Sequence, residues 1–437
     1  MAGLDKFFIL DNQSPCYIIS YTDVDIEIGE DQMRKCILDS YDKTPILQNI
    51  LYIENDQVVS TKYNQFNVDE HYEMKYLNSE HFRSYIKKLA NNNTNNCGKT
   101  ILDWYFFCCV DKSAKKSRVY MKINHSKCDG TSLINMLRNS SLLKMNAPKI
   151  NEAANICKEL KQPPYNKTIS FCDKIYYQIV GFVLLFILNI KVALKLVMCY
   201  FRNTLNNTLN NTSNNTSNNT LKNNDDSVSG NEKKRIRYIE CNPLSLIKLK
   251  AVSKYKNITI NDLLFSIMVR ADNLYYKNKR DLVIVCPFSS NNLDKSQKSN
   301  NNFVPIAVTV SNHHDKETIL KKVSTTLNSY KHSAFLFCLH KLISFLNSKF
   351  NINIFSLYSI GPSCVDYIFT NMVGPDISGS QLTDIHFFVT PRNNEIIYNT
   401  ISAGNKLNII CSFIDETINK SLFEKCIYEA YKEMVLV

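Results

Sequence analysis

The chain has 437 residues, a length that favours two domains, and 44% of them are hydrophobic, as in an ordinary globular protein. Its formal net charge of +12 suits nucleic acid, an anionic membrane surface or an anionic cofactor. The basic residues are scattered, and the sequence has neither zinc-ligand spacing nor a recognised nucleic-acid module, so nucleic acid is excluded as an expected partner and no metal site is predicted.

The 15 cysteines lack the regular spacing of a disulfide framework, and Cys108 and Cys109 lie inside an apolar run. Asp5 and Lys6 precede any useful apolar stretch, so no signal peptide is expected. These features predict free, mostly buried thiols in a reducing compartment.

A strand, a loop and a helix follow one another between Val119 and Leu137. Apolar residues alternate with Tyr120, Lys122 and Asn124, which is the period of a strand with one apolar face. The loop that follows contains His125 and Asp129, and a helix is predicted from Ser132 onward. This element belongs to an N-terminal domain of residues 1–170.

An apolar segment, residues 171–202, comes next. Its uncharged run of 16 residues, 175–190, is shorter than the roughly 20 needed to cross a bilayer. Lys191 and Lys195 could extend from it to a headgroup layer. A membrane-embedded or interfacial helix is the preferred interpretation, and a full span or a buried helix of a soluble fold are the alternatives.

Repeated Asn-Asn-Thr sequences occur in an Asn-rich tract over residues 203–224, which has almost nothing to bury, and residues 203–230 are predicted to be a disordered linker. A second domain of residues 231–437 follows. It contains a helix start with a capping threonine at Thr259 and a closing helix over 420–434. Its predicted strands cover residues 282–286, 303–310, 366–370, 395–401 and 407–413.

His125 is the residue best suited to chemistry. A histidine at a strand end can project into a cleft, and its ordinary pKa near 6.5 lets it accept a proton at neutral pH. Asp129 could orient this ring, or it could cap the following helix, and Gly130 permits a tight turn. The alternative is an exposed loop histidine beside a helix-capping aspartate.

The residues from Ile123 to Leu133 contain His-x-x-x-Asp-Gly between a strand and a helix, and they resemble the wax ester synthase/diacylglycerol acyltransferase (WS/DGAT) family of CoA-dependent acyltransferases. Three further stretches are similar to motifs of that family in the same order. They are Phe66–His71, Thr259–Asp262 and Thr370–Pro375. The resemblance covers residues 66 to 415.

The sequence departs from the family pattern at three places. Asn124 stands where the family has the first of two adjacent histidines, while His125 retains the second. The family's Pro-Leu-Trp motif is reduced to Ile101-Leu102-Asp103-Trp104, and Val373 replaces a frequent proline.

The resemblance implies an α/β (α+β) fold of two chloramphenicol-acetyltransferase-like domains, each a mixed sheet flanked by helices, with a tunnel between them. It makes His125 the catalytic base, and it makes Asp129 and Gly130 the structural support of the catalytic loop. The residues that it implies shape the tunnel or the substrate site are Asn124, Asn261, Asp262, Asn371, Gly374 and Pro375. A helix cap at Asn261-Asp262 and a simple turn at Gly374-Pro375 remain alternatives.

The activity that the resemblance implies is O-acyl transfer from long-chain acyl-CoA to a fatty alcohol or diacylglycerol, giving wax ester or triacylglycerol. Acyl-CoA is a co-substrate, and no other cofactor and no metal is expected. The expected location is a membrane surface, of the endoplasmic reticulum or the plasma membrane, with the catalytic domains facing the cytosol. The alternatives are a related acyltransferase with a different small acceptor, an inactive lipid-binding or scaffold relative, and an unrelated membrane-anchored interaction module.

Overall fold

The computed structural model describes residues 16–54, 57–91, 103–139, 235–277, 281–289, 303–311, 315–332, 365–377, 380–391 and 396–435. The predicted apolar segment and the Asn-rich linker, residues 171–202 and 203–230, lie outside these ranges. Within the described ranges, none of the helices combines the length and the apolar character that a bilayer crossing requires.

The N-terminal half contributes strands, α-helices and three short 3-10 helices (η). They are β1 Tyr17–Val24, α2 Glu30–Lys43, η1 Pro45–Gln48, β2 Asn49–Glu54, β3 Gln57–Lys62, η2 Val68–Glu70, β4 Tyr72–Tyr76, η3 Ser79–His81, α3 Phe82–Asn91, β5 Trp104–Asp111, β6 Lys116–Asn124 and α4 Gly130–Asn139.

The described elements of the C-terminal half begin after the linker. They are β7 Arg237–Glu240, β8 Leu244–Ser245, α8 Leu246–Tyr255, α9 Ile260–Tyr276, β9 Asp281–Ser289, β10 Phe303–Ser311, α10 Lys316–His332, β11 Tyr367–Val373, β12 Leu382–Val389, β13 Ile396–Ala403, β14 Lys406–Phe413 and α13 Lys420–Val435.

The strands form two mixed sheets and one hairpin. The first sheet has the order β12-β1-β6-β5-β4, in which only the β4–β5 pair is parallel. The second has the order β10-β9-β11-β13-β14-β7, with β11 parallel to both of its neighbours and β8 added to β14. β2 and β3 pair separately. The predicted two-domain mixed α/β architecture is confirmed.

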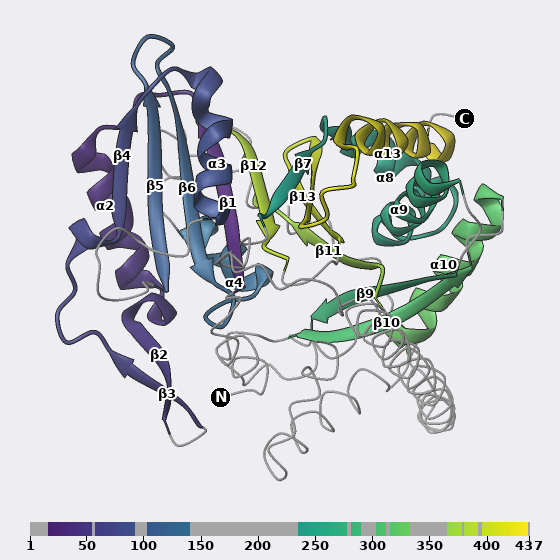
Figure 1. Cartoon of the computed structure of the whole chain (residues 1–437), viewed down its shortest axis with the longest axis horizontal. Coiled ribbons are helices and arrows are strands. Elements are labelled where there is room, and N and C mark those ends of the chain that lie inside the picture. The colour runs from purple at the N-terminus through teal and green to yellow at the C-terminus, as the bar shows by residue number, and fades with distance from the viewer. Residues whose placement is uncertain are drawn as a thin grey trace, which may run out of the picture.

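β12 crosses from one half to the other. It belongs to the C-terminal half of the sequence, but it pairs antiparallel with β1 along its length (Figure 1). Asn408 on β14 donates a hydrogen bond to the carbonyl of Ile385 at 2.8 Å, and Ser412 donates one to that of Val389 at 2.7 Å. The C-terminal half of the sequence therefore gives one strand, β12, to the N-terminal sheet.

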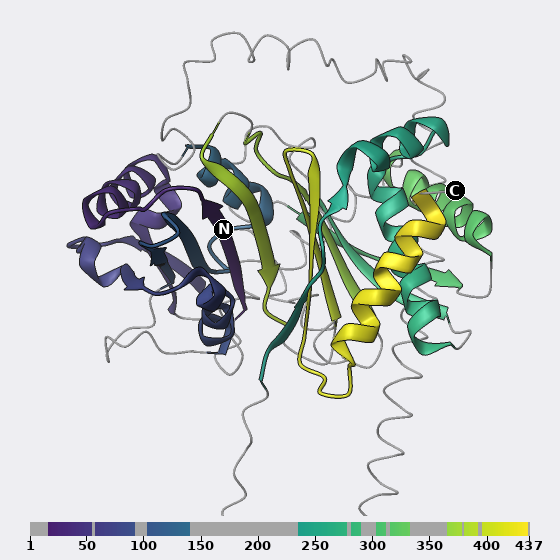
Figure 2. The ribbon, with the colours of Figure 1, turned by 90° about the horizontal axis from the view of Figure 1, so that it is seen from above.

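Helices cover these sheets unequally. α2 and α4 pack on one face of the first sheet, and α3 packs on the other. α8, α9, α10 and α13 all pack on one face of the second sheet, on the side away from the first sheet (Figure 2). The opposite face of the second sheet presents Met372, Ile401 and Ala403, which join the core under α2 and α4. The two halves therefore share a hydrophobic core.

The predicted elements agree closely with those observed. The strand expected over 119–123 is β6, and the helix expected from Ser132 begins two residues earlier, at Gly130. All five strands predicted in the second half are present, as are the helix after Thr259 and the closing helix. β11 and β13 each contribute side chains to both hydrophobic cores, because alternate positions of a strand face opposite sides of the sheet.

Candidate active site

His125 follows directly after β6, at the edge where the two halves meet. Its backbone N–H donates to the carbonyl of Cys16 at 2.8 Å, which ties the strand end to the residue before β1. Its side chain is only 8% exposed. The imidazole is therefore held in the interior and is not an exposed loop group.

Asn124 shapes the turn that carries His125. Its side-chain oxygen accepts the N–H of Ser126 at 2.9 Å, and its carbonyl accepts the N–H of Lys127 at 2.9 Å. Its own N–H donates to the carbonyl of Asp103 at 2.6 Å. An amide side chain at this position thus supplies a local acceptor that closes the turn.

Asp129 has the helix-capping geometry that was one of its two expected roles. Its carboxylate accepts the N–H of Ser132 at 2.8 Å, and its carbonyl accepts the N–H of Leu133 at 3.0 Å. These bonds satisfy N–H groups in the first turn of α4, which have no partner inside the helix. The carboxylate therefore fixes where α4 begins relative to His125.

Gly130 lies where the loop after β6 meets the second half. A Cβ atom at this position would come within 2.1 Å of the sulfur of Met372, which is buried on β11. The missing side chain lets the start of α4 approach β11 closely. The loop after β6 and the strand that carries Asn371 are consequently in direct contact.

Asn261 and Asn371, two residues proposed from sequence, lie together. The side-chain amide of Asn371 donates to the side-chain oxygen of Asn261 at 3.3 Å, and the Thr400 hydroxyl donates to the side-chain oxygen of Asn371 at 2.7 Å. Asn371 immediately precedes Met372, so a continuous set of contacts leads from Gly130 through β11 to the start of α9.

Asp262 instead points into the C-terminal half and has the structural role that the sequence left open. Its carboxylate accepts the N–H of Thr259 at 3.0 Å, and its own N–H donates to the Thr259 hydroxyl at 3.2 Å. The Ser324 hydroxyl on α10 donates to the same carboxylate at 3.4 Å. Asp262 is fully buried, and it joins α9 to α10.

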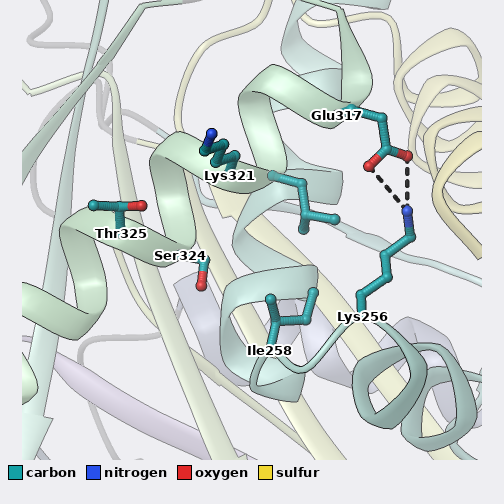
Figure 3. Close-up of a pocket in the computed structure, with 7 residues that line it drawn as sticks. Lys256, Ile258, Glu317, Lys321, Ser324 and Thr325 are labelled. Carbon is teal, nitrogen blue, oxygen red and sulfur yellow. Dashed lines mark hydrogen bonds and ion pairs between the residues drawn. The ribbon is translucent and has the colours of Figure 1, made fainter.

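A pocket of about 270 Å³ lies beside this contact, between α10 and the loop before α9. Figure 3 shows Ser324 and Lys321 of α10 opposite Ile258, with Lys256 and Glu317 at one end. The Lys256 ammonium lies 2.7 Å and 3.0 Å from the two oxygens of Glu317. An ion pair therefore closes this end of the pocket, and none of its lining residues belongs to the His125 loop.

Gly374 and Pro375 end β11. A Cβ atom at Gly374 would lie 1.9 Å from the carbonyl oxygen of Ser402, a backbone atom of the neighbouring strand β13. The N–H of Gly374 also donates to the Ser402 hydroxyl at 3.2 Å. Glycine is required here by close backbone approach, and Pro375 beside it is buried.

Replacing Gly374 with alanine is expected to lower the free energy of unfolding by roughly 1–3 kcal/mol or more, because a backbone oxygen cannot move aside as a side chain can. Gly29→Ala is the matched control, since its added Cβ would have its nearest neighbour 3.9 Å away. The control should lose less than about 1 kcal/mol. Urea denaturation of both variants measures the difference, and equal losses would contradict the backbone-contact argument.

Lys127 and Asp103 were not predicted from sequence. The Lys127 side chain is completely buried, its ammonium lies 3.0 Å from a carboxylate oxygen of Asp103, and it donates to the carbonyl of Asn49. Burial lowers the pKa of Lys127, while Asp103 opposes that shift. This pair supports the loop from beneath. The only sequence signal was a lysine within two residues of the candidate base.

His71, in a stretch similar to a family motif, has a packing role. It is 1% exposed, its ring stacks on Trp104 at a centroid distance of 3.9 Å, and its Nδ1 lies 3.2 Å from the Trp104 carbonyl oxygen. Burial lowers its pKa. The ring therefore fills the core beside β5 in its neutral form.

Another buried histidine, His386, lies on β12. The ring of His386 stacks on Tyr21 at a centroid distance of 4.6 Å, and its Nε2 lies 3.5 Å from a carboxylate oxygen of Asp384. Burial opposes ionisation of Asp384, but the bonds from His386 and Asn408 lower its pKa overall. Sequence alternation could have indicated this strand, but not that it pairs with β1.

Lys122 gives the fold a pH dependence. Its ammonium donates to the carbonyl of Leu89 at 2.9 Å and lies 4.1 Å from the ring centroid of Tyr17. Burial lowers its pKa from 10.5 to about 8. Between these values the unfolded chain binds the proton and the native chain does not, so stability contributed through Lys122 rises with pH.

Replacing Lys122 with methionine should remove that rise, which amounts to about 3 kcal/mol at most. The measurement is the difference in free energy of unfolding between the parent and Lys122→Met at pH 7.5 and pH 10. The stability of the parent relative to Lys122→Met should be greater at pH 10 than at pH 7.5. Lys250→Met, at an exposed position of α8, is the control. A pH-independent difference for Lys122→Met would contradict the assignment.

The described residues contain no group of three or more His, Cys, Asp or Glu side chains placed to hold a metal ion. The nine cysteines among them are all buried thiols.

Comparisons with known proteins bear on the fold. Residues 300–435 match the model of the WS/DGAT C-terminal domain. The structure is similar to wax ester synthase/diacylglycerol acyltransferase from Marinobacter aquaeolei VT8, with 12% identity, a TM-score of 0.56, and coverage of 99% of this chain and 98% of that one. No curated protein sequence matches the chain.

Two other solved structures are similar at the same identity. For trichothecene 15-O-acetyltransferase from Fusarium sporotrichioides the identity is 12%, the TM-score is 0.59, and the match covers 99% of this chain and 93% of that one. For the epimerization domain of the third module of tyrocidine synthetase B the identity is 12%, the TM-score is 0.55, and the coverage is 100% and 94%. The same two-domain arrangement thus occurs in proteins of different named activities.

Proposed function

We propose that the chain, whose residues 300–435 match the model of the WS/DGAT C-terminal domain, is an O-acyltransferase of that family that moves a long-chain acyl group from acyl-CoA to a fatty alcohol or diacylglycerol. The products are wax ester or triacylglycerol. His125 is the general base.

The observation that carries this proposal is the position of His125. His125 is buried directly after β6, in the short loop that leads to Gly130, whose close approach to Met372 joins the two halves. A base must come within hydrogen-bond reach of the hydroxyl that it deprotonates. A tunnel between the halves would bring acyl-CoA and the alcohol to this residue from opposite sides.

In the proposed mechanism, a ring nitrogen of His125 takes the proton of the acceptor hydroxyl as the oxygen attacks the thioester carbonyl carbon. The tetrahedral intermediate collapses, the carbon–sulfur bond breaks, and the ester forms. The CoA thiolate then takes the proton from the imidazolium, which restores neutral His125. The proton lost by the hydroxyl ends on the CoA thiol, and the reaction needs no covalent acyl-enzyme.

The residues around His125 hold its loop in position. Asp129 fixes the start of α4, Lys127 and Asp103 hold the loop from beneath, and Asn124 closes the turn. The hydrogen bond between Asn371 and Asn261 supports placing both in the wall that the second half would contribute to the tunnel. We assign positioning or substrate-shaping roles to all of these residues and to Gly374 and Pro375. We assign a proton-transfer role to none of them.

Two other functions are compatible with the fold. One is acyl transfer to a different small acceptor, and the other is an inactive lipid-binding or scaffold role. The family match favours a lipid acceptor over the first. A panel of alcohols and amines with labelled palmitoyl-CoA separates these, because a scaffold protein would bind acyl-CoA without releasing CoA.

The test of the proposed function is product analysis in a host that lacks neutral-lipid synthesis. Expression of the chain should yield wax ester when a fatty alcohol is supplied, or triacylglycerol when it is not. His125→Ala at equal abundance is the control and should yield neither. The absence of both products from a well-folded parent protein would overturn the proposal.

We also propose that the apolar segment, residues 171–202, holds the protein at a membrane surface, at the endoplasmic reticulum or plasma membrane with the catalytic domains toward the cytosol. Both substrates concentrate at membranes. Deleting this segment should move the protein to the soluble fraction after cell lysis and high-speed centrifugation. Retention in the membrane fraction would show that another part of the chain is the main anchor.

A further inference from the structure

A basic pocket lies where α3 of the N-terminal half meets β7 and α13 of the C-terminal half. Its volume is about 480 Å³. The basic residues that line it are Lys87 and Lys88 of α3, Arg237 of β7, Lys420 of α13, and Arg235, which precedes β7. No acidic side chain is among the described residues that line it. We name it the interdomain basic pocket.

Among the described residues, the ion-pair partner of a pocket cation is Glu416, which is mostly exposed. Arg237 pairs with Glu416, whose carboxylate oxygen lies 2.5 Å from it and whose side chain is 71% exposed. Lys420 contacts the face of Tyr238, with its ammonium 6.0 Å from the ring centroid. Burial lowers the pKa of Lys420, and the positive charges of Lys87 and Arg237 lower it further. Like charges have thus been brought together at a cost that a bound anion would remove.

The walls of the pocket are fixed to each other across the two halves. The side-chain amide of Asn91, at the end of α3, donates to the carbonyl of Ile236 at 3.1 Å and accepts the N–H of Ile236 at 2.7 Å. The hydroxyl of Tyr238 donates to the carbonyl of Arg83 at 2.9 Å. The cations therefore stand on a preformed frame and not on separate loops.

α13 adds a further attraction for an anion. This helix begins at Lys420, and its first N–H groups carry the positive end of the helix dipole. One of them, the N–H of Leu422, already donates to the side chain of Asn419 at 3.1 Å. The helix end supports the cations, and it does not make the site by itself.

One hydrogen bond joins α3, which lines the interdomain basic pocket, to β6, which ends just before His125. Lys122 donates to the carbonyl of Leu89, which lies between the pocket residues Lys88 and Asn91 on α3. Lys122 precedes His125 by three residues, roughly 10 Å along a strand. The helix that carries two of the pocket cations is therefore bonded to the strand that ends at the candidate base.

We propose that the interdomain basic pocket binds a phosphate group of an anionic ligand and that acyl-CoA supplies it through its nucleotide phosphates. Lysine and arginine side chains from three elements, with a helix N-terminus, are suited to a multiply charged phosphate. The naming of acyl-CoA rests on the proposed function. The same phosphate chemistry occurs in the headgroups of anionic lipids, which the experiment distinguishes.

The test uses the full chain and two double variants of equal charge change. Lys87→Gln/Lys420→Gln removes two pocket cations, and Lys250→Gln/Lys254→Gln removes two exposed cations of α8 as the matched control. Binding of CoA and of CoA lacking its 3′-phosphate is measured by titration calorimetry. Sedimentation with phosphatidylcholine vesicles, with and without phosphatidic acid, measures lipid binding.

The pocket variant is expected to bind CoA about tenfold more weakly or worse, and the control is expected to bind it as the parent does. Equal affinities for CoA and for phosphatidic acid vesicles in the two double variants would overturn the proposal. Loss of vesicle binding alone would assign the pocket to lipid phosphates and overturn the acyl-CoA assignment. His125→Ala should bind CoA as the parent does. If the parent chain fails to transfer an acyl group but binds CoA more tightly than the pocket variant does, the proposed reaction is rejected and the phosphate site is retained.

Discussion

Replacement of His125 by alanine is expected to lower kcat for ester formation by a factor of about 10²–10⁴, the usual contribution of one general base. The fold should persist, since the backbone bond to Cys16 and the cap by Asp129 do not use the imidazole. The measurement is the initial rate of labelled ester formation at saturating palmitoyl-CoA, with circular dichroism as the check on folding.

His81→Ala is the matched control for this prediction. The His81 side chain is 62% exposed and lies on η3, and its only described ion pair is with the adjacent Glu80. It should retain the parent rate. A folded His125→Ala variant that works at the rate of the control would remove His125 from the mechanism.

The second large effect is expected at the pair beneath the loop. Asp103→Asn should lower the free energy of unfolding by about 3–5 kcal/mol, because it leaves the buried ammonium of Lys127 without its counter-charge. Trp104, the only tryptophan, is fully buried beside Asp103, so its fluorescence during urea denaturation reports on this region directly. Activity should fall as well, since the pair supports the loop that carries His125.

The double variant Asp103→Asn/Lys127→Met separates lost charge pairing from lost packing. Methionine retains most of the lysine's apolar length without a charge, so the double variant should recover much of the stability lost in Asp103→Asn. Lys256→Met is the surface comparison, because its partner Glu317 is 61% exposed, and it should cost 1 kcal/mol or less, as exposed ion pairs do. Additive losses in the double variant would contradict the buried-pair account.

Local sequence pattern was sufficient for elements whose signals are contiguous. The alternation from Val119 to Asn124 predicted β6, and Thr259 with Asp262 predicted the start of α9, because strand period and capping chemistry act over a few residues. His125, Asn261 and Asn371 were proposed from short motifs, and the structure brings the last two into contact.

Long-range pairing is what the sequence could not specify. β12 has an ordinary strand pattern, but Asp384 on it lies 362 residues after its hydrogen-bond partner Thr22 on β1, and no local feature selects that pairing over another. The burial of Lys127 likewise depends on Asp103, which directly precedes β5, and on Asn49, which begins β2. The interdomain basic pocket arises for the same reason, since its cations are scattered along the sequence.

The most direct test of the account is the stoichiometry of the reaction catalysed by the purified full-length chain. Palmitoyl-CoA and hexadecanol or diacylglycerol are supplied in detergent micelles, and released CoA thiol and labelled ester are measured together. The account predicts one ester formed for each thiol released, with both rates lost in His125→Ala. Thiol release without ester, or ester formation that persists in His125→Ala, would contradict it.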